Sequence, residues 1–284
     1  MSIKSLNLWV KKLVILGIFI GIIIITAELD WSAEHSTVGI FIRFLWLASL
    51  LIIGISLSIF FIYFAGNIIQ EKGISDKMWF YISIILFIIA NGIPIIFYVI
   101  LEISPGFIFY LQIILMGLLP AFIIQPKNLK TRFLIILILD ALILVPLIYL
   151  VNSAINDLWA GIPTTSTIYY LSFWGLLMPF LYLILAISWK FGGGTKRQSW
   201  NIFVSAMLLQ TSTLEDFFYF FINGQPLPGM WPWMQNFVIN LEVLFGHIPT
   251  DLDILIFCSI ITPIAIFILF DVHGYIWEKI KSKK

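Results

Sequence analysis

The sequence predicts an all-α protein, a polytopic bundle of about eight membrane-spanning helices. Of its 284 residues, 61% are apolar and only 11% are charged, and the mean hydropathy is +1.05. Soluble domains carry about a quarter charged residues, so this chain has too little polar surface to cover a globule in water. Apolar runs of about 20 residues, the length that crosses a bilayer, recur from end to end. We expect a single transmembrane domain over residues 1–284.

The predicted spans are bounded by charged residues, glycine or proline. They cover residues 12–27, 40–66, 78–101, 106–125, 133–152, 167–190, 201–223 and 253–271. The first span follows Lys4, Lys11 and Lys12, as a signal peptide would. No small-x-small cleavage site follows it directly, so we expect this span to be retained.

Basic residues fix the expected orientation. With a cytoplasmic N-terminus, all of the 16 Lys and Arg residues except Arg43 fall in inside segments. The outside segments carry only acids: Glu28, Asp30, Glu34, Glu102, Asp157, Glu242, Asp251 and Asp253. Because Lys and Arg near span ends resist translocation, both termini are predicted to be cytoplasmic, in a multi-pass protein of the cell (plasma) membrane.

The longest outside segment lies between the seventh and eighth spans. Its apolar part is too short to cross a bilayer, and prolines bracket it, while Trp231 and Trp233 suit a membrane interface. We predict a re-entrant or interfacial helix near 233–247 that caps the bundle from outside. A plain interfacial helix with no site beneath it is the alternative.

Several function classes are excluded by missing residues. No span contains the mid-membrane lysine that a retinal protein needs, and the three histidines (His35, His247 and His273) lie outside the spans, which argues against haem. A single cysteine, Cys258, argues against disulfides and multi-cysteine metal sites. The net charge of +1 argues against a nucleic-acid partner. We therefore expect no cofactor and no metal.

The seventh span is the most polar. In NIFVSAMLLQTSTLEDFFYFFIN, six polar residues recur at helical spacing, which predicts one polar stripe facing a bundle interior or a wet cavity: Asn201, Ser205, Ser212, Asp216, Tyr219 and Asn223. Glu215 borders the stripe. A charged side chain within a bilayer is energetically costly, so each acid inside a span needs a structural or functional reason. Glu215 and Asp216 lie in the outer half of the bilayer, and Asp140 lies in the inner half.

The acids of the seventh span are the candidate catalytic residues. Desolvation and mutual repulsion are expected to keep at least one of these two carboxyls neutral and able to donate a proton. Four further residues are expected to bind substrate: Asn91, Arg43, Tyr219 and Gln112. The structural alternative is an ion pair between Arg43 and one of the acids that fixes helix packing, with Asn91 and Gln112 as interhelical hydrogen-bond partners.

The stretch LEDFFYFF at 214–221 resembles the acidic-aromatic stretches of the small integral-membrane lycopene cyclases. The resemblance covers eight residues of the 284, and the chain lacks both the proline just before the acids and a second acidic-aromatic copy in an earlier span. The resemblance implies one chemistry for these groups, acid catalysis on a hydrophobic substrate.

These observations predict a membrane enzyme that acts on a lipid or isoprenoid, with Glu215 and Asp216 as general acid and base. A proton- or cation-coupled transporter is the first alternative, in which the same acids bind the ion and Asp140 continues the path. A non-catalytic membrane subunit or scaffold is the second. The expected partners are membrane lipids and a hydrophobic small molecule or ion, and a homo-oligomer is left open.

Overall fold

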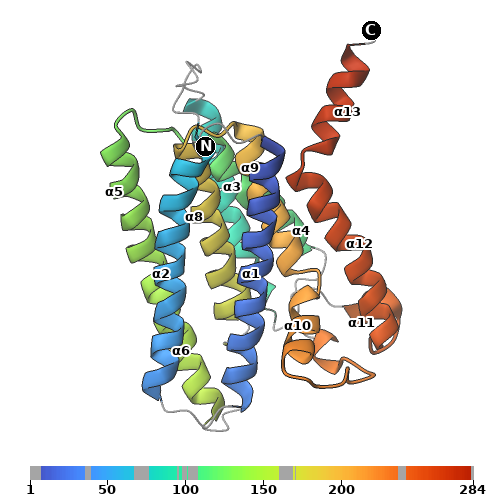
Figure 1. Cartoon of the computed structure of the whole chain (residues 1–284). Helices are drawn as coiled ribbons and strands as arrows, with labels where there is room; N and C mark the ends of the chain where they lie inside the picture. The colour runs from blue at the N-terminus through green and yellow to red at the C-terminus, as the bar shows by residue number, and fades with distance from the viewer. Residues whose placement is uncertain are drawn as a thin grey trace.

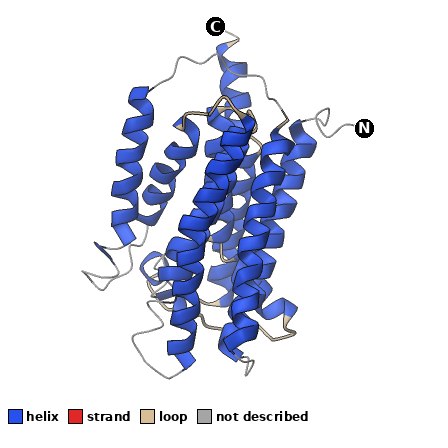
Figure 2. Ribbon diagram, turned by 90° about the vertical axis from the view of Figure 1, so that its left-hand side faces the viewer, coloured by secondary structure: helices blue, strands red, loops and turns tan. Residues whose placement is uncertain are grey.

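The computed structural model describes residues 8–35, 40–66, 77–94, 96–97, 101, 108–159, 169, 171–235 and 241–282. Within these residues the chain is helical and contains no strand, which confirms the predicted all-α class (Figure 2). The helices are aligned along one axis as a bundle, and the start of α1 and the end of α12 lie at the same end of it (Figure 1).

The helical elements follow the predicted spans closely. Those of the first half are α1 (Leu8–His35), α2 (Ile40–Ala65), α3 (Lys77–Pro94), α4 (Ile108–Phe122), α5 (Leu129–Leu139), η3 (Asp140–Leu144) and α6 (Val145–Trp159). Those of the second half are η4 (Leu171–Leu177), α8 (Met178–Phe191), α9 (Lys196–Gln210), α10 (Leu214–Ile222), η5 (Pro232–Gln235), α11 (Leu241–Phe245), α12 (Asp251–Leu269) and α13 (Val272–Lys281).

Five of the described helical stretches are long and apolar enough to cross a membrane. They are Leu8–Ser32, Ala48–Ala65, Leu129–Ile155, Leu171–Phe191 and Asp251–Leu269, and two shorter apolar helices cover Lys77–Gly92 and Ile108–Phe122. The outer surface of the bundle is apolar as well, with side chains such as Leu142 and Tyr149 each 71% exposed. Such a surface suits lipid and would be an aggregation hazard in water. The length and apolar composition of these helices are consistent with a multi-pass membrane protein.

The seventh predicted span is not one helix. It divides into α9 and α10, because Thr211 to Thr213 leave the helical path and Thr213 adopts a left-handed conformation, with φ of 67°. The expectation of one continuous polar stripe from Asn201 to Asn223 is therefore wrong. Three consecutive hydroxyl residues provide the physical reason, since their side chains bond to nearby backbone groups and compete with helical pairing.

The stretch η4–α8 forms the centre of the bundle. It is the most buried of the five long stretches, with 83% of its apolar window inside the protein. It packs against α2 on one side and α9 on the other, and α4 also contacts it. The contact with α2 is very close at Gly192, where an added Cβ would overlap the carbonyl oxygen of Ile62.

Two wide, π-helical turns interrupt long helices of the bundle. The turn η3 ends two residues before Pro146, and η4 ends two residues before Pro179. Proline has no backbone N–H and its ring crowds the preceding turn, so regular pairing fails there and the turn widens. The first of these turns begins at Asp140 and therefore fixes the position of that acid.

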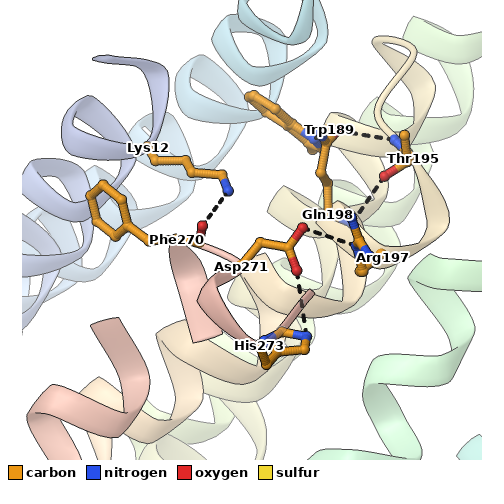
Figure 3. Close-up of polar contacts among 8 residues, drawn as sticks. All are labelled: Lys12, Trp189, Thr195, Arg197, Gln198, Phe270, Asp271 and His273. Carbon is orange, nitrogen blue, oxygen red and sulfur yellow. Dashed lines mark hydrogen bonds and ion pairs between the residues drawn. The ribbon is translucent and has the colours of Figure 1, made fainter. Parts of the chain in front are cut away.

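Polar contacts join α1, α9 and α12 at the end of the bundle where α1 begins (Figure 3). Lys12 Nζ donates to the Phe270 carbonyl at 2.8 Å, and Arg197 Nε lies 2.9 Å from Asp271 Oδ2. Asp271 has φ of 57° and separates α12 from α13. His273 Nε2 lies 3.4 Å from the other carboxylate oxygen, Oδ1. These contacts tie the last long helix to the rest of the bundle.

The predicted interfacial helix near 233–247 is only partly as expected. The structure has a short 3₁₀ turn, η5, and a one-turn helix, α11, while residues 236–240 lie outside the described part of the chain. Trp231 is fully buried, and its backbone N–H donates to the Pro249 carbonyl at 2.8 Å. The segment therefore folds back onto the bundle as a packed cap.

Candidate functional site

The two candidate acids occupy the first turn of α10, immediately after the helix break. Glu215 is buried, with 5% of its surface exposed, while Asp216 is partly exposed. The first turn of a helix presents unpaired backbone N–H groups and a partial positive charge, which favours carboxylates there. The break therefore gives the acids a stabilising position that an uninterrupted span would lack.

The break itself is buried and polar. Gln210, Thr211, Ser212 and Thr213 are each at most 4% exposed. Tyr182 Oη of α8 donates to Gln210 Oε1 at 2.7 Å, and Ser212 Oγ donates to the Leu209 carbonyl at 2.7 Å. Backbone freed from helical pairing in a membrane must find partners inside the protein, and these side chains supply some of them.

An aromatic cluster lies against the acid-bearing turn. It consists of Phe217 and Phe220 of α10 with Trp231 and Trp233 of the folded-back segment. The ring centroids of the two tryptophans are 5.3 Å apart, and that of Trp231 lies 5.4 Å from Phe220 and 5.8 Å from Phe217. Trp233 Nε1 donates to Asp216 Oδ1 at 3.2 Å. One candidate acid is thus held directly by the aromatic cluster.

Tyr219 lies one turn after the acids and faces α1. Its ring meets Trp31 edge-on, with centroids 5.0 Å apart, and its carbonyl accepts a hydrogen bond from Asn223 Nδ2 at 2.9 Å. On α1, Asp30 Oδ1 accepts a hydrogen bond from Tyr169 Oη at 2.5 Å. The C-terminal part of α1 therefore supplies one wall beside α10.

Asn91 lies near the level of the helix break. Trp79 of α3 stacks on Phe122 of α4 with centroids 5.6 Å apart, and this antiparallel register brings Asn91 opposite Tyr110. Tyr110 in turn lies next to Thr211. Asn91 Nδ2 donates to the Phe87 carbonyl at 2.8 Å, while its Oδ1 is buried without a hydrogen-bond partner among the described residues.

Gln112 lies deeper than the acids. Gly117 of α4 meets Trp200 and Phe203 of α9, and Tyr110 lies next to Thr211, which together bring Gln112 opposite the last turns of α9. That level is roughly 10 Å inward of Glu215, at 1.5 Å per residue. Gln112 Nε2 donates weakly to Met116 Sδ at 3.7 Å, and its buried Oε1 has no partner in the described part of the chain.

Two other residues that the sequence singled out lie apart from this group. Arg43 belongs to α2, but its side chain is outside the described residues, so its expected pairing with an acid stays a prediction. Asp140 lies in the wide turn η3, between α5 and α6. Its environment is therefore separate from that of the acids on α10, as its position along the fifth predicted span indicated. No group of three His, Cys, Asp or Glu side chains that suits a metal occurs in the described ranges.

Sequence reasoning missed the partner of Asp216. From the sequence, Trp231 and Trp233 were interpreted as residues at a membrane interface. In the structure Trp231 is fully buried, and Trp233 donates a hydrogen bond to Asp216. The prolines that bracket these tryptophans were the sequence feature that could have predicted the folded-back segment. Proline interrupts a helix and so allows the chain to turn back. Comparisons with protein-family models, with curated proteins and with solved structures give no match.

Proposed function

We propose that this protein is a membrane enzyme that acts on a lipid or isoprenoid by acid–base chemistry at Glu215 and Asp216. The observation that carries the proposal is the position of this acid pair at the start of α10, directly after a buried break and against a cluster of four aromatic rings. Acids with aromatic walls suit a substrate that is itself apolar.

The chemistry follows from these two components. Glu215, the more buried acid, donates a proton to a carbon–carbon double bond, which leaves a carbocation on the neighbouring carbon. The faces of aromatic rings stabilise such a cation electrostatically. Asp216 then removes a proton from an adjacent carbon. The sum for the substrate is an isomerisation or cyclisation in which no proton is gained or lost. Transfer of a proton from Asp216 back to Glu215, directly or through water, restores the starting state of the two acids, so no further reactant is needed.

The remaining candidates orient the substrate. Asn91 has a free amide oxygen near the level of the break, and Tyr219 lies one turn beyond the acids. Arg43 holds a carboxylate or headgroup of the substrate, and Gln112 binds a part that reaches deeper. A hydrophobic chain enters from the surrounding lipid, so membrane lipids are the immediate partners, and the proposal leaves a homo-oligomer open.

The proposal includes eight crossings with both termini on the cytoplasmic side of the cell membrane. The five long helical stretches, the two shorter apolar helices and the broken pair α9–α10 supply segments for all eight. The contact between Lys12 and Phe270 supports an even number, because it joins the start of α1 to the end of α12. Labelling of single introduced cysteines from each side of the membrane tests this topology.

A proton- or cation-coupled transporter is the second candidate. Helices that break within the membrane are a recurring feature of transporters, where the unwound segment binds ion or substrate. The buried break at residues 211–213 favours this candidate. The transporter candidate predicts that Asp140→Asn abolishes function as fully as Asp216→Asn. An enzyme with its site in the outer half of the bilayer tolerates the change at Asp140.

Mass spectrometry of the molecules retained by the purified protein tests the enzyme proposal. Wild type is compared with Glu215→Gln and Asp216→Asn, and with Glu28→Gln as a control at a partly buried acid outside the site. We expect wild type and the control to carry a selectively enriched lipid or isoprenoid that is lost or chemically different in both site variants. Bulk phospholipid alone in all four samples would count against the proposal.

A further inference from the structure

Asp140 is a buried acid that the proposed reaction does not use. Its side chain is 0% exposed, and neither carboxylate oxygen has a hydrogen-bond partner among the described residues. A buried carboxylate without a partner is strongly unfavourable, so this acid stays ionised only where a cation balances its charge. It stands at the start of the wide turn η3, and such turns are frequent at functional sites.

Ser58 of α2 lies at the level of Asp140. The two helices run antiparallel, and two contacts set their register. An added Cβ on Gly54 would lie 3.2 Å from Leu144 Cδ1, and the rings of Tyr63 and Phe133 are 5.4 Å apart. Ser58 comes four residues after Gly54, and Asp140 comes four residues before Leu144. Because residues four apart lie on the same face of a helix, Ser58 and Asp140 both face the interface between these two helices.

Ser188 of α8 adds a third polar group at this level. Helices α2 and α8 run parallel, with the ring centroids of Phe61 and Trp189 6.1 Å apart. This register brings Ser188 within about one turn of Ser58. Both serines are 0% exposed, and both hydroxyl oxygens lack a partner in the described part of the chain. The turn η3 contacts α2 and α8.

We propose that Asp140, Ser58 and Ser188 bind a monovalent metal cation, with Na⁺ as the fitting ion. The three side chains offer only oxygen atoms, which are the ligands of hard cations. One carboxylate balances one positive charge, so a divalent ion would leave a buried excess.

On the described parts of the neighbouring helices, no basic side chain pairs with Asp140. The side chains described on α2 (48–65) and α6 (145–155) include no charged residue. On α5, Arg132 lies eight residues from Asp140, roughly 12 Å along the helix. Its guanidinium donates to the carbonyls of Pro126 and Phe191, both at 2.6 Å. Lys190 is the charged residue of α8, two positions past Ser188 and therefore on another face.

A recess lies beyond the site, at the end where α2 and α8 finish. This recess, with an empty volume of about 280 Å³, counting open solvent, is lined by residues of α2, α5 and α8, among them Ile62 and Arg132. Ile62 lies one turn from Ser58 on the same face of α2. The recess therefore comes within about one helical turn of Ser58 along α2.

Thermal unfolding of the purified full-length protein in detergent tests the proposal. The melting temperature is followed through a NaCl series balanced with choline chloride, and in parallel with LiCl and KCl. A ligand that binds only the folded state raises the melting temperature saturably. We expect that response to Na⁺ in wild type, its loss in Asp140→Asn, and about a tenfold higher half-saturating Na⁺ concentration in Ser58→Ala and Ser188→Ala.

Two controls separate this site from the rest of the bundle. Ser205 is equally buried, but its hydroxyl donates to the Ile202 carbonyl, so Ser205→Ala keeps the wild-type response to Na⁺. Asp216→Asn keeps it too. Equal melting temperatures of wild type in Na⁺, K⁺ and choline would overturn the proposal, as would a pH response without an Na⁺ response. If Asp140→Asn does not fold, the two serine variants decide the result.

Discussion

Basic side chains bind the carbonyl ends of three helices at the end of the bundle where α1 begins. Lys11 Nζ donates to the Ala65 carbonyl at 3.2 Å, Lys12 Nζ to Phe270, and Arg132 Nη1 to Phe191. Those carbonyls end α2, α12 and α8. Cations at helix C-termini satisfy unpaired carbonyls and oppose the negative end of the helix dipole. Residues that indicate orientation in the sequence thus also stabilise the fold.

Arg132 gives the sharpest test of this role. It is 2% exposed and makes two short hydrogen bonds to carbonyls. We expect Arg132→Leu to lower the free energy of unfolding by about 3 kcal/mol, because it removes charge-assisted hydrogen bonds. Lys130→Leu is the control, since Lys130 is exposed two residues away. Equal melting temperatures of the two variants would show that the carbonyl contacts of Arg132 add no stability.

At the candidate site, the sequence predicted the acids but not their surroundings. Glu215 and Asp216 were identifiable because an intramembrane carboxyl is costly in any helix. Trp233 was not identifiable as a partner of Asp216, because the two residues meet only where the segment after α10 folds back onto the bundle. The serines beside Asp140 were missed for a related reason. Serine is common in membrane helices, and only the register of three helices brings Ser58 and Ser188 to the level of Asp140. That both hydroxyls lack a partner among the described residues is likewise visible only in the structure.

Among the elements, α9 and α10 depart most from the sequence prediction. The periodicity of polar residues continues across residues 211–213, and no glycine or proline marks a break there. The break depends on local hydroxyl-to-backbone bonds, such as that from Ser212 to Leu209, and on tertiary contacts such as that from Tyr182 to Gln210. Tertiary contacts of this kind cannot be read from spacing. By contrast, the end of α3 coincides with Pro94, and the wide turns η3 and η4 lie just before Pro146 and Pro179. A proline in the sequence marks each of these positions.

The close approach of α8 to α2 gives a prediction at this scale. Gly192 has φ of −76°, which alanine adopts readily, but an added methyl group would overlap the Ile62 carbonyl oxygen. We expect Gly192→Ala to lower the free energy of unfolding by about 2 kcal/mol through overpacking. Gly21→Ala on α1 is the matched control, because nothing lies within 4 Å of its added Cβ. That variant is expected to be neutral or stabilising, by up to about 1 kcal/mol.

Unfolding followed by tryptophan fluorescence in detergent compares the two glycine variants. A melting temperature of Gly192→Ala at or above that of wild type would contradict the close packing of α8 on α2. A large loss in Gly21→Ala would show instead that α1 has a packed face where the structure leaves space.

For the whole molecule, composition and basic residues predicted the class and the approximate span positions. Apolar runs of the right length must cross the bilayer as helices, because lipid offers no hydrogen-bond partner to exposed backbone. Which helices touch was not predictable, since helices that are apolar all round carry no directional pattern. The central position of η4–α8 follows instead from fitted contacts, such as the close approach at Gly192.

The proposed function depends on proton transfer at the acid pair of α10, and deuterium incorporation measures that transfer most directly. The purified protein with its retained lipid is incubated in D₂O, extracted and returned to H₂O, so that only carbon-bound deuterium remains. We predict a mass increase in the retained lipid or isoprenoid for wild type and for Asp140→Asn, and none for Glu215→Gln. No carbon-bound deuterium in wild type, or equal incorporation in Glu215→Gln, would contradict the account.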